Sequence, residues 1–138
     1  MSLKRTVLLA AASAFVVASP AGAGGTATIT ISHQMHGCHM WQLGTGAPKP
    51  TLSITLSAGT VVRFVNNDVM PHKLAQLAGP KLALVRPSMK HMGAATSVEL
   101  RQRGVYRFTT RPGEDYAWAK SMKTIGEDYV LQLRVRVK

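Results

Sequence analysis

The sequence predicts an all-β fold, a β-sandwich or barrel of seven to eight short strands in a single domain. The first observation is that short runs of β-branched and apolar residues alternate with polar residues, as strands with one buried face do. The second is that glycine, proline and asparagine clusters separate these runs. The third is the lack of any long helical periodicity, internal repeat or low-complexity tract in the 138 residues. A chain of this length has room for one hydrophobic core.

The strands are expected wherever the alternation is clean. The turn at 57–60 is expected to join two of them as a hairpin, 51–56 with 61–65, and the turn at 102–104 to reverse the chain between two others. The expected strands are Thr26–Ser32, Thr51–Leu56, Val61–Val65, Lys73–Leu77, Lys81–Val85, Thr96–Arg101, Val105–Thr109 and Tyr129–Val137.

The first 23 residues have the build of a secretory signal peptide. Lys4 and Arg5 precede an apolar run from Val7 to Val17, and a small-residue Ala21-Gly22-Ala23 site follows. The apolar run is shorter than the roughly 20 residues needed to span a bilayer. We therefore expect a periplasmic or otherwise exported protein with its folded domain at 24–138, the alternative being an uncleaved membrane anchor.

The chain is strongly basic, with a formal net charge of +11. In an exported protein this charge favours an acidic partner protein or peripheral contact with an anionic membrane surface. The cations are single residues spread along strands, without a basic helix or interleaved aromatic residues, so no nucleic-acid partner is expected.

One stretch concentrates side chains that bind soft and borderline metals. His33 to Trp41, HQMHGCHMW, holds the one cysteine, three of the five histidines and two of the seven methionines. Thiolate, imidazole and thioether together are the ligands of copper, and the first two also bind zinc. Because one cysteine forms no internal disulfide, Cys38 is expected to be buried, dimerised or metal-bound in an oxidising compartment.

Three segments carry a family resemblance. Val61 to His72, VVRFVNNDVMPH, resembles the cupredoxins, plastocyanin-like copper proteins in which a strand ends in Asn and a histidine a few residues later is a copper ligand. RGVYRF, 103–108, resembles the Gly-x-Tyr-x-Phe hairpin that leads into the family's ligand cysteine, and 126–137 is similar to the closing strand. The resemblance implies a cupredoxin-like Greek-key β-sandwich or barrel and a copper cofactor.

The sequence departs from the family where the usual Cys-His-Met ligand loop should be. Thr110 stands in the place of the cysteine, and no histidine follows it. Only Met122 stands where the family has its axial methionine. If the strands succeed one another up and down, however, the loops holding His33–Trp41, His72, Met89–Met92 and Met122 lie at one end of the sandwich. We therefore expect a copper site rebuilt around the first loop.

The candidate ligands of this site fall into two groups. Cys38 and His72 are the central candidates, and the alternative for His72 is a loop histidine hydrogen-bonded to Asn66 or Asp68. His33 is expected to lie in the core or behind the ligands, and Met35, Met70, Met89, His91 and Met92 are expected to form a collar around them. The remaining candidates are His36 and His39 as imidazole ligands, and Met40 and Met122 as alternatives for a weak axial position.

These residues predict a copper-binding protein that handles or carries copper, or transfers single electrons, with an acidic redox or copper-transfer partner. Zinc is the alternative metal. The alternative function is a partner-binding β-sandwich whose copper site has decayed. Single-cysteine haem attachment at Met35-His36-Gly37-Cys38-His39 is a more remote alternative. No enzymatic activity is expected, because no carboxylate accompanies the Cys/His pair and no glycine-rich oxyanion loop is evident.

Overall fold

The computed structural model describes residues 24–34, 39–112 and 131–138. Every regular element in these residues is a β-strand, so the predicted all-β class is confirmed. In these three ranges, no helix is long and apolar enough to cross a membrane. The strands are β1 (Thr26–His33), β2 (His39–Leu43), β3 (Thr51–Leu56), β4 (Thr60–Asn67), β5 (His72–Ala78), β6 (Ser88–Met89), β7 (Ala95–Leu100), β8 (Gly104–Pro112) and β9 (Gln132–Val137).

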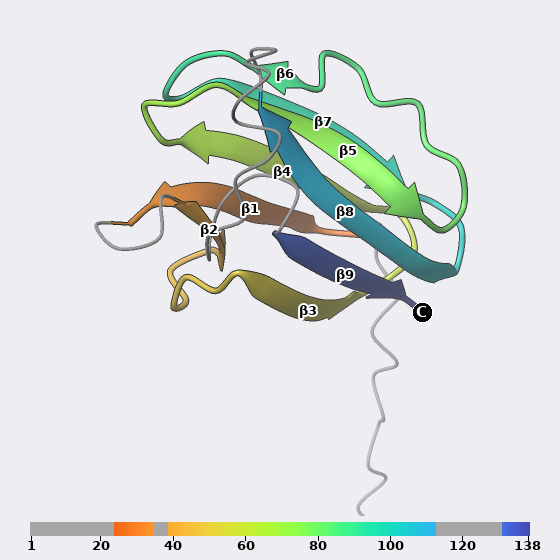
Figure 1. Ribbon diagram of the computed structural model, residues 1–138. Helices are drawn as coiled ribbons and strands as arrows, with labels where there is room; N and C mark the ends of the chain where they lie inside the picture. Colours follow the sequence, from red (N-terminus) through yellow and green to blue (C-terminus); the bar gives the residue numbers. More distant parts are fainter. Residues whose placement is uncertain (1–23, 35–38, 113–130) are drawn as a thin grey trace, which may run out of the picture.

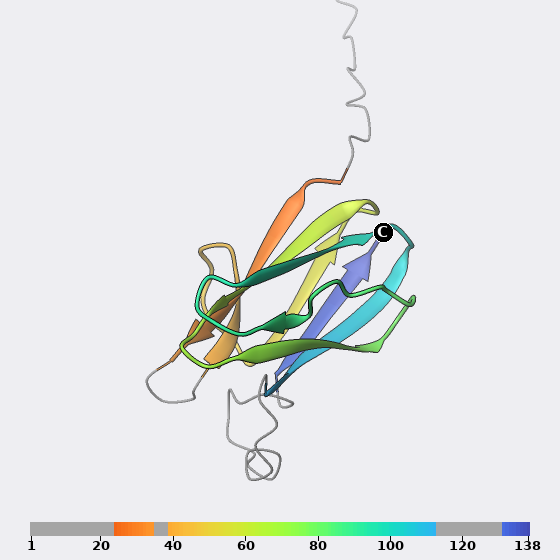
Figure 2. The ribbon, with the colours of Figure 1, turned by 90° about the horizontal axis from the view of Figure 1, so that it is seen from above.

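The strands form the two layers of the predicted β-sandwich (Figure 1). One sheet has four strands in the order β2-β1-β4-β7, and the other has five in the order β3-β9-β8-β5-β6. The pairs β1/β4 and β3/β9 are parallel and the others antiparallel. Because parallel neighbours need a crossover, the chain passes repeatedly from one sheet to the other (Figure 2).

The inward faces of the two sheets meet in one hydrophobic core. Its largest side chains are Trp41 and Phe64 from the four-stranded sheet and Tyr106 and Phe108 from the five-stranded sheet, and none of them is exposed. Phe64 and Phe108 join the two layers, with ring centroids 5.4 Å apart. Successive side chains of a strand point to opposite faces, and these residues lie at the alternate positions that point inward.

Three of the expected local structures are wrong. Strands β3 and β4 do not form a hairpin, since β3 pairs with β9 and β4 with β1 and β7. Strands β7 and β8 likewise lie in different sheets, so the turn at 102–104 arches between layers. In both cases the turn predicts that the chain reverses its direction. It does not predict which strand the next strand pairs with, because packing of the two layers decides that.

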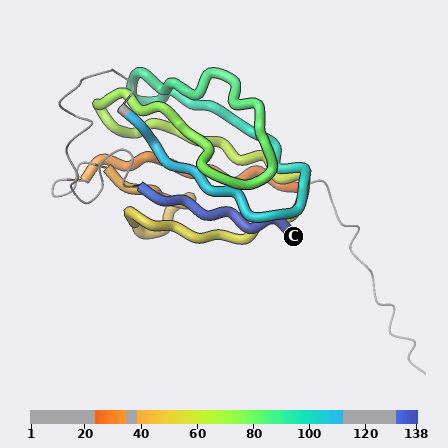
Figure 3. Tube along the Cα trace, turned by 45° about the vertical axis from the view of Figure 1, so that its right-hand side comes forward, coloured from red at the N-terminus to blue at the C-terminus, as the bar shows by residue number. Residues whose placement is uncertain are grey.

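The third wrong expectation is a strand at 81–85. Leu82 and Leu84 do alternate inward against the core, but the segment joins no sheet. The path of the chain from β5 to β6 can be followed in Figure 3. Pro80 and Pro87 bracket it and lack the N–H that a ladder needs. The Leu82 N–H instead donates to the side chain of Gln76.

The strand directions bring several loops to one end of the sandwich. Strands β1 and β4 run parallel and end there, and β2, antiparallel to β1, begins there. The histidine that opens β5 is in register with Pro112 at the end of β8. This end therefore gathers the start of β2, the end of β4 and the start of β5.

Candidate metal centre

His39 and His72 meet at this end of the core. Each is the first residue of its strand, β2 and β5 respectively, and each faces inward. His72 is fully buried and His39 is nearly so. Their ring centroids are 4.3 Å apart, with the planes at 66°. Two imidazoles from different sheets thus stand edge to face inside the protein.

Asp68 lies between the histidines. It follows β4 directly, and its side chain is buried. Its Oδ2 is 2.9 Å from Nε2 of His72 and 3.4 Å from Nδ1 of His39. Its Oδ1 is 2.9 Å from Nδ1 of His33. A single carboxylate therefore contacts three imidazoles.

The carboxyl of Asp68 is held in its charged form. Burial is the largest influence and opposes ionisation, but hydrogen bonding and charge from His72 act against it, together with hydrogen bonds from His33 and the Val69 N–H. The net effect lowers the pKa of Asp68 below its ordinary value. A buried carboxylate is tolerable when its oxygens are paired in this way.

Asn66 fixes the loop that carries Asp68. Its Oδ1 accepts from the Asp68 N–H at 2.9 Å, and its Nδ2 donates to the carbonyls of Met70 and Met89. Its own backbone bonds to Gly93 and Ala94. One buried asparagine thus ties the segment before β5 to β6 through its side chain and to the segment before β7 through its backbone.

The three buried side chains form a donor set that could hold a metal ion. One atom from each of His39, Asp68 and His72 lies within 4.8 Å of the others. Two imidazole nitrogens and a carboxylate oxygen suit divalent copper or zinc, whose ligand distances are about 2.0 to 2.2 Å. Met89 is also close by, because it is buried and in register with His72 in the β5/β6 pair.

The structure brings together some of the predicted site residues. His39 and His72 are adjacent, as the loop order predicts. Met40 follows His39 in β2 and therefore projects from the opposite face of the strand. His33 was expected in the core or behind the ligands. Its side chain is 55% exposed and so lies outside the core, and its ring contacts Asp68. Cys38, His36 and Met122 lie outside the described residues.

The expected methionine-rich collar is present in part. Met70 and Met92 are half exposed at this end, whereas Met89 is buried and contributes to the core. His91 is exposed, and its Nδ1 lies 3.1 Å from the Met92 carbonyl, so it does not point into the centre formed by His39 and His72. Met35 is outside the described residues.

Asp68 was not predicted as part of a metal site. The sequence indicated it only as a hydrogen-bond partner of His72, and that hydrogen bond is present, but in the buried interior and not on a surface loop. The useful signal was the spacing of Asp68 and His72, four residues apart with Pro71 between them. Met89 was expected in the collar around the ligands, but only sheet pairing places it directly opposite His72, which the sequence does not indicate.

Comparisons with known proteins bear on the fold. No protein-family model matches the sequence, and no curated protein matches it. Among solved structures, the chain is similar to a purple cupredoxin from Nitrosopumilus maritimus, with 17% identity over 81% of this chain and 99% of that one and a TM-score of 0.49. It is also similar to a Cu(I) form of an amicyanin variant, with 17% identity over 80% of this chain and 82% of that one and a TM-score of 0.41.

A third similar structure is part of a larger protein, the Cu-containing nitrite reductase from Thermus scotoductus. The identity is 17%, the TM-score is 0.47, and the match covers 83% of this chain but 27% of the reductase. At this identity the likeness concerns the fold alone. The described residues form a β-sandwich of nine strands. Seven of the eight expected strands are among them, the expected strand at 81–85 is absent, and β2 and the two-residue β6 were not predicted as strands.

Proposed function

We propose that the chain is an exported copper-binding protein whose site is built on His39, Asp68 and His72. The observation that carries the proposal is the convergence of these three buried donors within 4.8 Å at one end of the sandwich. Export is proposed on the signal-peptide pattern of residues 1–23. We propose a binding role and not a catalytic one.

Copper is proposed over zinc because of the sulfur ligands near these donors. Cys38 immediately precedes His39 in the sequence, and Met89 lies opposite His72. Sulfur ligands favour copper, and Cu(I) in particular, whereas imidazole and carboxylate also accept Cu(II). Cys38, His36 and Met122 remain predicted ligands from sequence, while Met40 is left out of the proposed site because of the face it occupies.

When bound, copper would supply a one-electron redox couple or a transferable ion. The protein's own part is to hold the ligands: Asp68 orients the imidazoles of His39 and His72, and the core around them excludes water. We favour copper handling over electron transfer, because the family's ligand loop is replaced and His33 leaves a partly exposed imidazole at the rim. Delivery would then be to an acidic partner protein.

The test is a Cu(II) titration of the protein followed by calorimetry and EPR. The unmodified chain is expected to bind one ion with nitrogen hyperfine structure in the spectrum. Replacement of either core imidazole, in His39→Asn or His72→Asn, is expected to weaken binding at least 100-fold. His91→Asn is the matched control, because His91 is exposed and turned to its own loop.

Cys38→Ala separates the sulfur contribution from that of the imidazoles. An intense thiolate-to-copper absorption band that is lost in this variant would add Cys38 to the ligands. Retained binding without such a band would leave a site of imidazole and carboxylate. Equal affinities in His39→Asn, His72→Asn and His91→Asn would refute the proposed site.

A second candidate function is favoured by one observation. Asp68 pairs with His33 and His72 at 2.9 Å and lies 3.4 Å from His39 without a metal ion, so the cluster is also consistent with a structural network in a partner-binding module. That function predicts no stoichiometric binding of Cu(II) or Cu(I), together with a large loss of stability in His72→Asn.

A further inference from the structure

The two outer faces of the sandwich differ sharply in charge. The outward positions of the five-stranded sheet carry five exposed cations and, among the described residues of its strands, no carboxylate. The outward positions of the four-stranded sheet carry one cation, Arg63, and one carboxylate, Glu99. The five cations, called the basic face below, are Lys73, Arg107, Arg111, Arg134 and Arg136.

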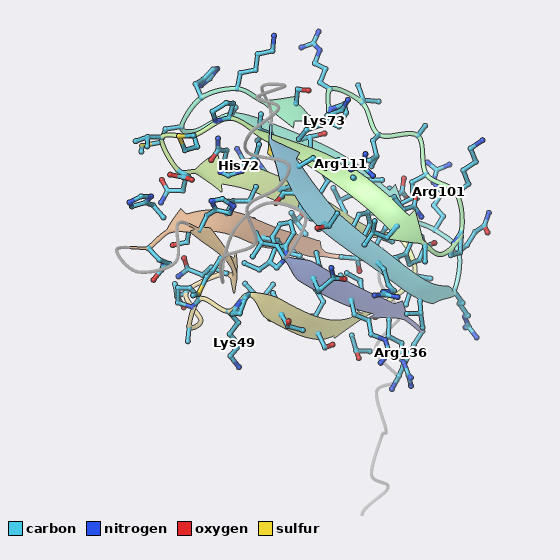
Figure 4. All side chains as sticks on the ribbon, in the orientation of Figure 1. Lys49, His72, Lys73, Arg101, Arg111 and Arg136 are labelled. Atoms are coloured by element: carbon cyan, nitrogen blue, oxygen red, sulfur yellow. The ribbon has the colours of Figure 1, made fainter. Side chains whose placement is uncertain are left out.

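Strand pairing places these cations side by side. Arg107 is directly opposite Arg134. Lys73 is directly opposite Arg111, and both are labelled in Figure 4. Arg136 is two residues beyond Arg134 on the same strand. Neighbouring strands are about 4.8 Å apart, and residues 107 and 111 are about 13 Å apart along β8. Like charges at such spacing repel each other.

The described residues do not neutralise this charge. The one Arg–Glu ion pair found in the described ranges joins Arg101 to Glu99, outside the basic face. The Arg107 guanidinium donates to the amide oxygen of Gln132, which is uncharged. On β3, which pairs with β9, the outward side chains are the hydroxyl residues Thr51, Ser53 and Thr55. The repulsion therefore has no internal compensation among these residues, and an external anion would relieve it.

We propose that the basic face binds the surface of an anionic lipid bilayer. The array covers three strands and is too extended for one small anion. It has no exposed aromatic side chain for stacking on bases and no exposed aromatic anchor of the kind that centres protein interfaces, among the residues described. A planar field of phosphate charges matches cations spread over a sheet, and arginine pairs well with phosphate.

The proposed orientation leaves the candidate metal centre accessible. His72 and Lys73 are consecutive in β5, so the centre stands at the strand ends while the cations project from the sheet face. If the outer face of this sheet lay on a membrane, the end of the sandwich that carries the centre would lie to the side of the contact and not in it. This inference does not depend on copper binding, because every residue in it lies outside the His39, Asp68 and His72 set.

The first experiment is sedimentation of the full chain with vesicles of phosphatidylglycerol and phosphatidylcholine, compared with phosphatidylcholine alone. We expect binding to the anionic vesicles that falls as salt is raised. The triple variant Arg107→Gln, Arg134→Gln and Arg136→Gln should lose about fivefold per charge, on the order of 100-fold in all.

A triple variant of equal net charge is the control. Arg63→Gln, Lys81→Gln and Lys90→Gln removes three exposed cations that lie elsewhere. We expect it to bind anionic vesicles nearly as the unmodified chain does. Equal losses of vesicle binding in the two triple variants would refute the proposal that the basic face is the binding surface. Preferential binding of polyglutamate or nucleic acid over the vesicles would refute the bilayer as its partner.

The apolar run from Val7 to Val17 is present in every variant and would itself hold the chain on vesicles. A second measurement avoids this problem. Anionic vesicles should protect Arg107, Arg134 and Arg136 from phenylglyoxal while Arg63 stays reactive. Equal protection of all four arginines, or of none, would contradict the proposal.

Discussion

Asp68 is the residue that most strongly determines the arrangement of the histidines. Its two oxygens contact His33, His39 and His72, and its charge is buried. We expect Asp68→Asn to lower the free energy of unfolding by about 1 to 3 kcal/mol, because hydrogen bonds to a charged group are lost inside the protein. Urea unfolding in the presence of a chelator measures this without any contribution from metal.

Glu99→Gln is the matched control for that substitution. Glu99 is the other described carboxylate, and it is exposed and paired with Arg101 on the surface. Its replacement should change the unfolding midpoint little, since an exposed ion pair contributes little. If the two variants unfolded at the same urea concentration, the buried network would not be the source of stability assigned to it.

Tyr106 gives a prediction on pH. Its ring is buried, its hydroxyl donates to the Gln102 carbonyl at 2.7 Å, and burial raises the pKa of the hydroxyl. A raised folded pKa means that this group's contribution to stability is complete below the unfolded pKa near 10 and is lost as the pH rises through the folded value. The unfolded state alone gains the phenolate in that range.

Tyr106→Phe should therefore behave differently at pH 8 and pH 11. At pH 8 the variant should be about 0.5 to 1.5 kcal/mol less stable, because the hydrogen bond is lost. At pH 11 the gap should narrow or reverse, since phenylalanine does not ionise in either state. Urea unfolding at both pH values measures the gap, and a gap independent of pH would contradict the assignment.

At the scale of the strand, Arg107 and Arg134 oppose each other across β8 and β9. Directly opposed like charges destabilise a sheet. We expect Arg134→Gln to raise the free energy of unfolding by about 0.2 to 1 kcal/mol at low salt, and the gain to shrink at high salt as the repulsion is screened. Thermal unfolding at two salt concentrations measures both effects.

Arg63→Gln is the control for the strand prediction. Arg63 is opposed by Ser97 in β7 and by Thr28 in β1, and neither residue carries a charge. Its replacement should produce no such salt-dependent gain. A gain of equal size in both variants would point to net charge, and not to the cross-strand pair, as the cause.

The elements were largely predictable from the sequence because alternation is a local property. The alternating runs around Ile29, Phe64 and Val135 indicate strands with one buried face, whichever strands they pair with. Pairing itself is not local, which is why the hairpin expected between 51–56 and 61–65 is wrong while both strands exist. The segment 81–85 also alternates because one of its faces packs on the core, although it joins no sheet.

The candidate site was predictable only in part. Side chains with obvious metal chemistry, His39 and His72, stood out by residue type, and the loop order placed them at one end. Asp68 is one of six acidic residues, and its spacing to His72 indicates a contact between the two, but the burial that makes it part of the site is not stated by a sequence. Met89 reaches the site through a two-residue strand that no periodicity reveals.

At the scale of the whole molecule, the two sheets share one core, so damage to one sheet should be felt in the other. β9 stands between β3 and β8, and Leu133 on it is buried. We expect Leu133→Ala to lower the free energy of unfolding by about 2 to 5 kcal/mol, a large share of the stability of a small domain. Its outward neighbour Arg134, replaced by alanine, is the control and should cost far less.

Trp41 provides a probe of this coupling because it lies in the opposite sheet, on β2. In a Trp118→Phe background its fluorescence reports the four-stranded sheet alone, while circular dichroism reports all the strands. A single core requires both signals to shift to the same lower urea midpoint in Leu133→Ala. If the Trp41 transition stayed in place while the circular dichroism transition moved, the sheets would unfold independently, and the candidate metal centre, which takes His39 from one sheet and His72 from the other, would lose its rigid support.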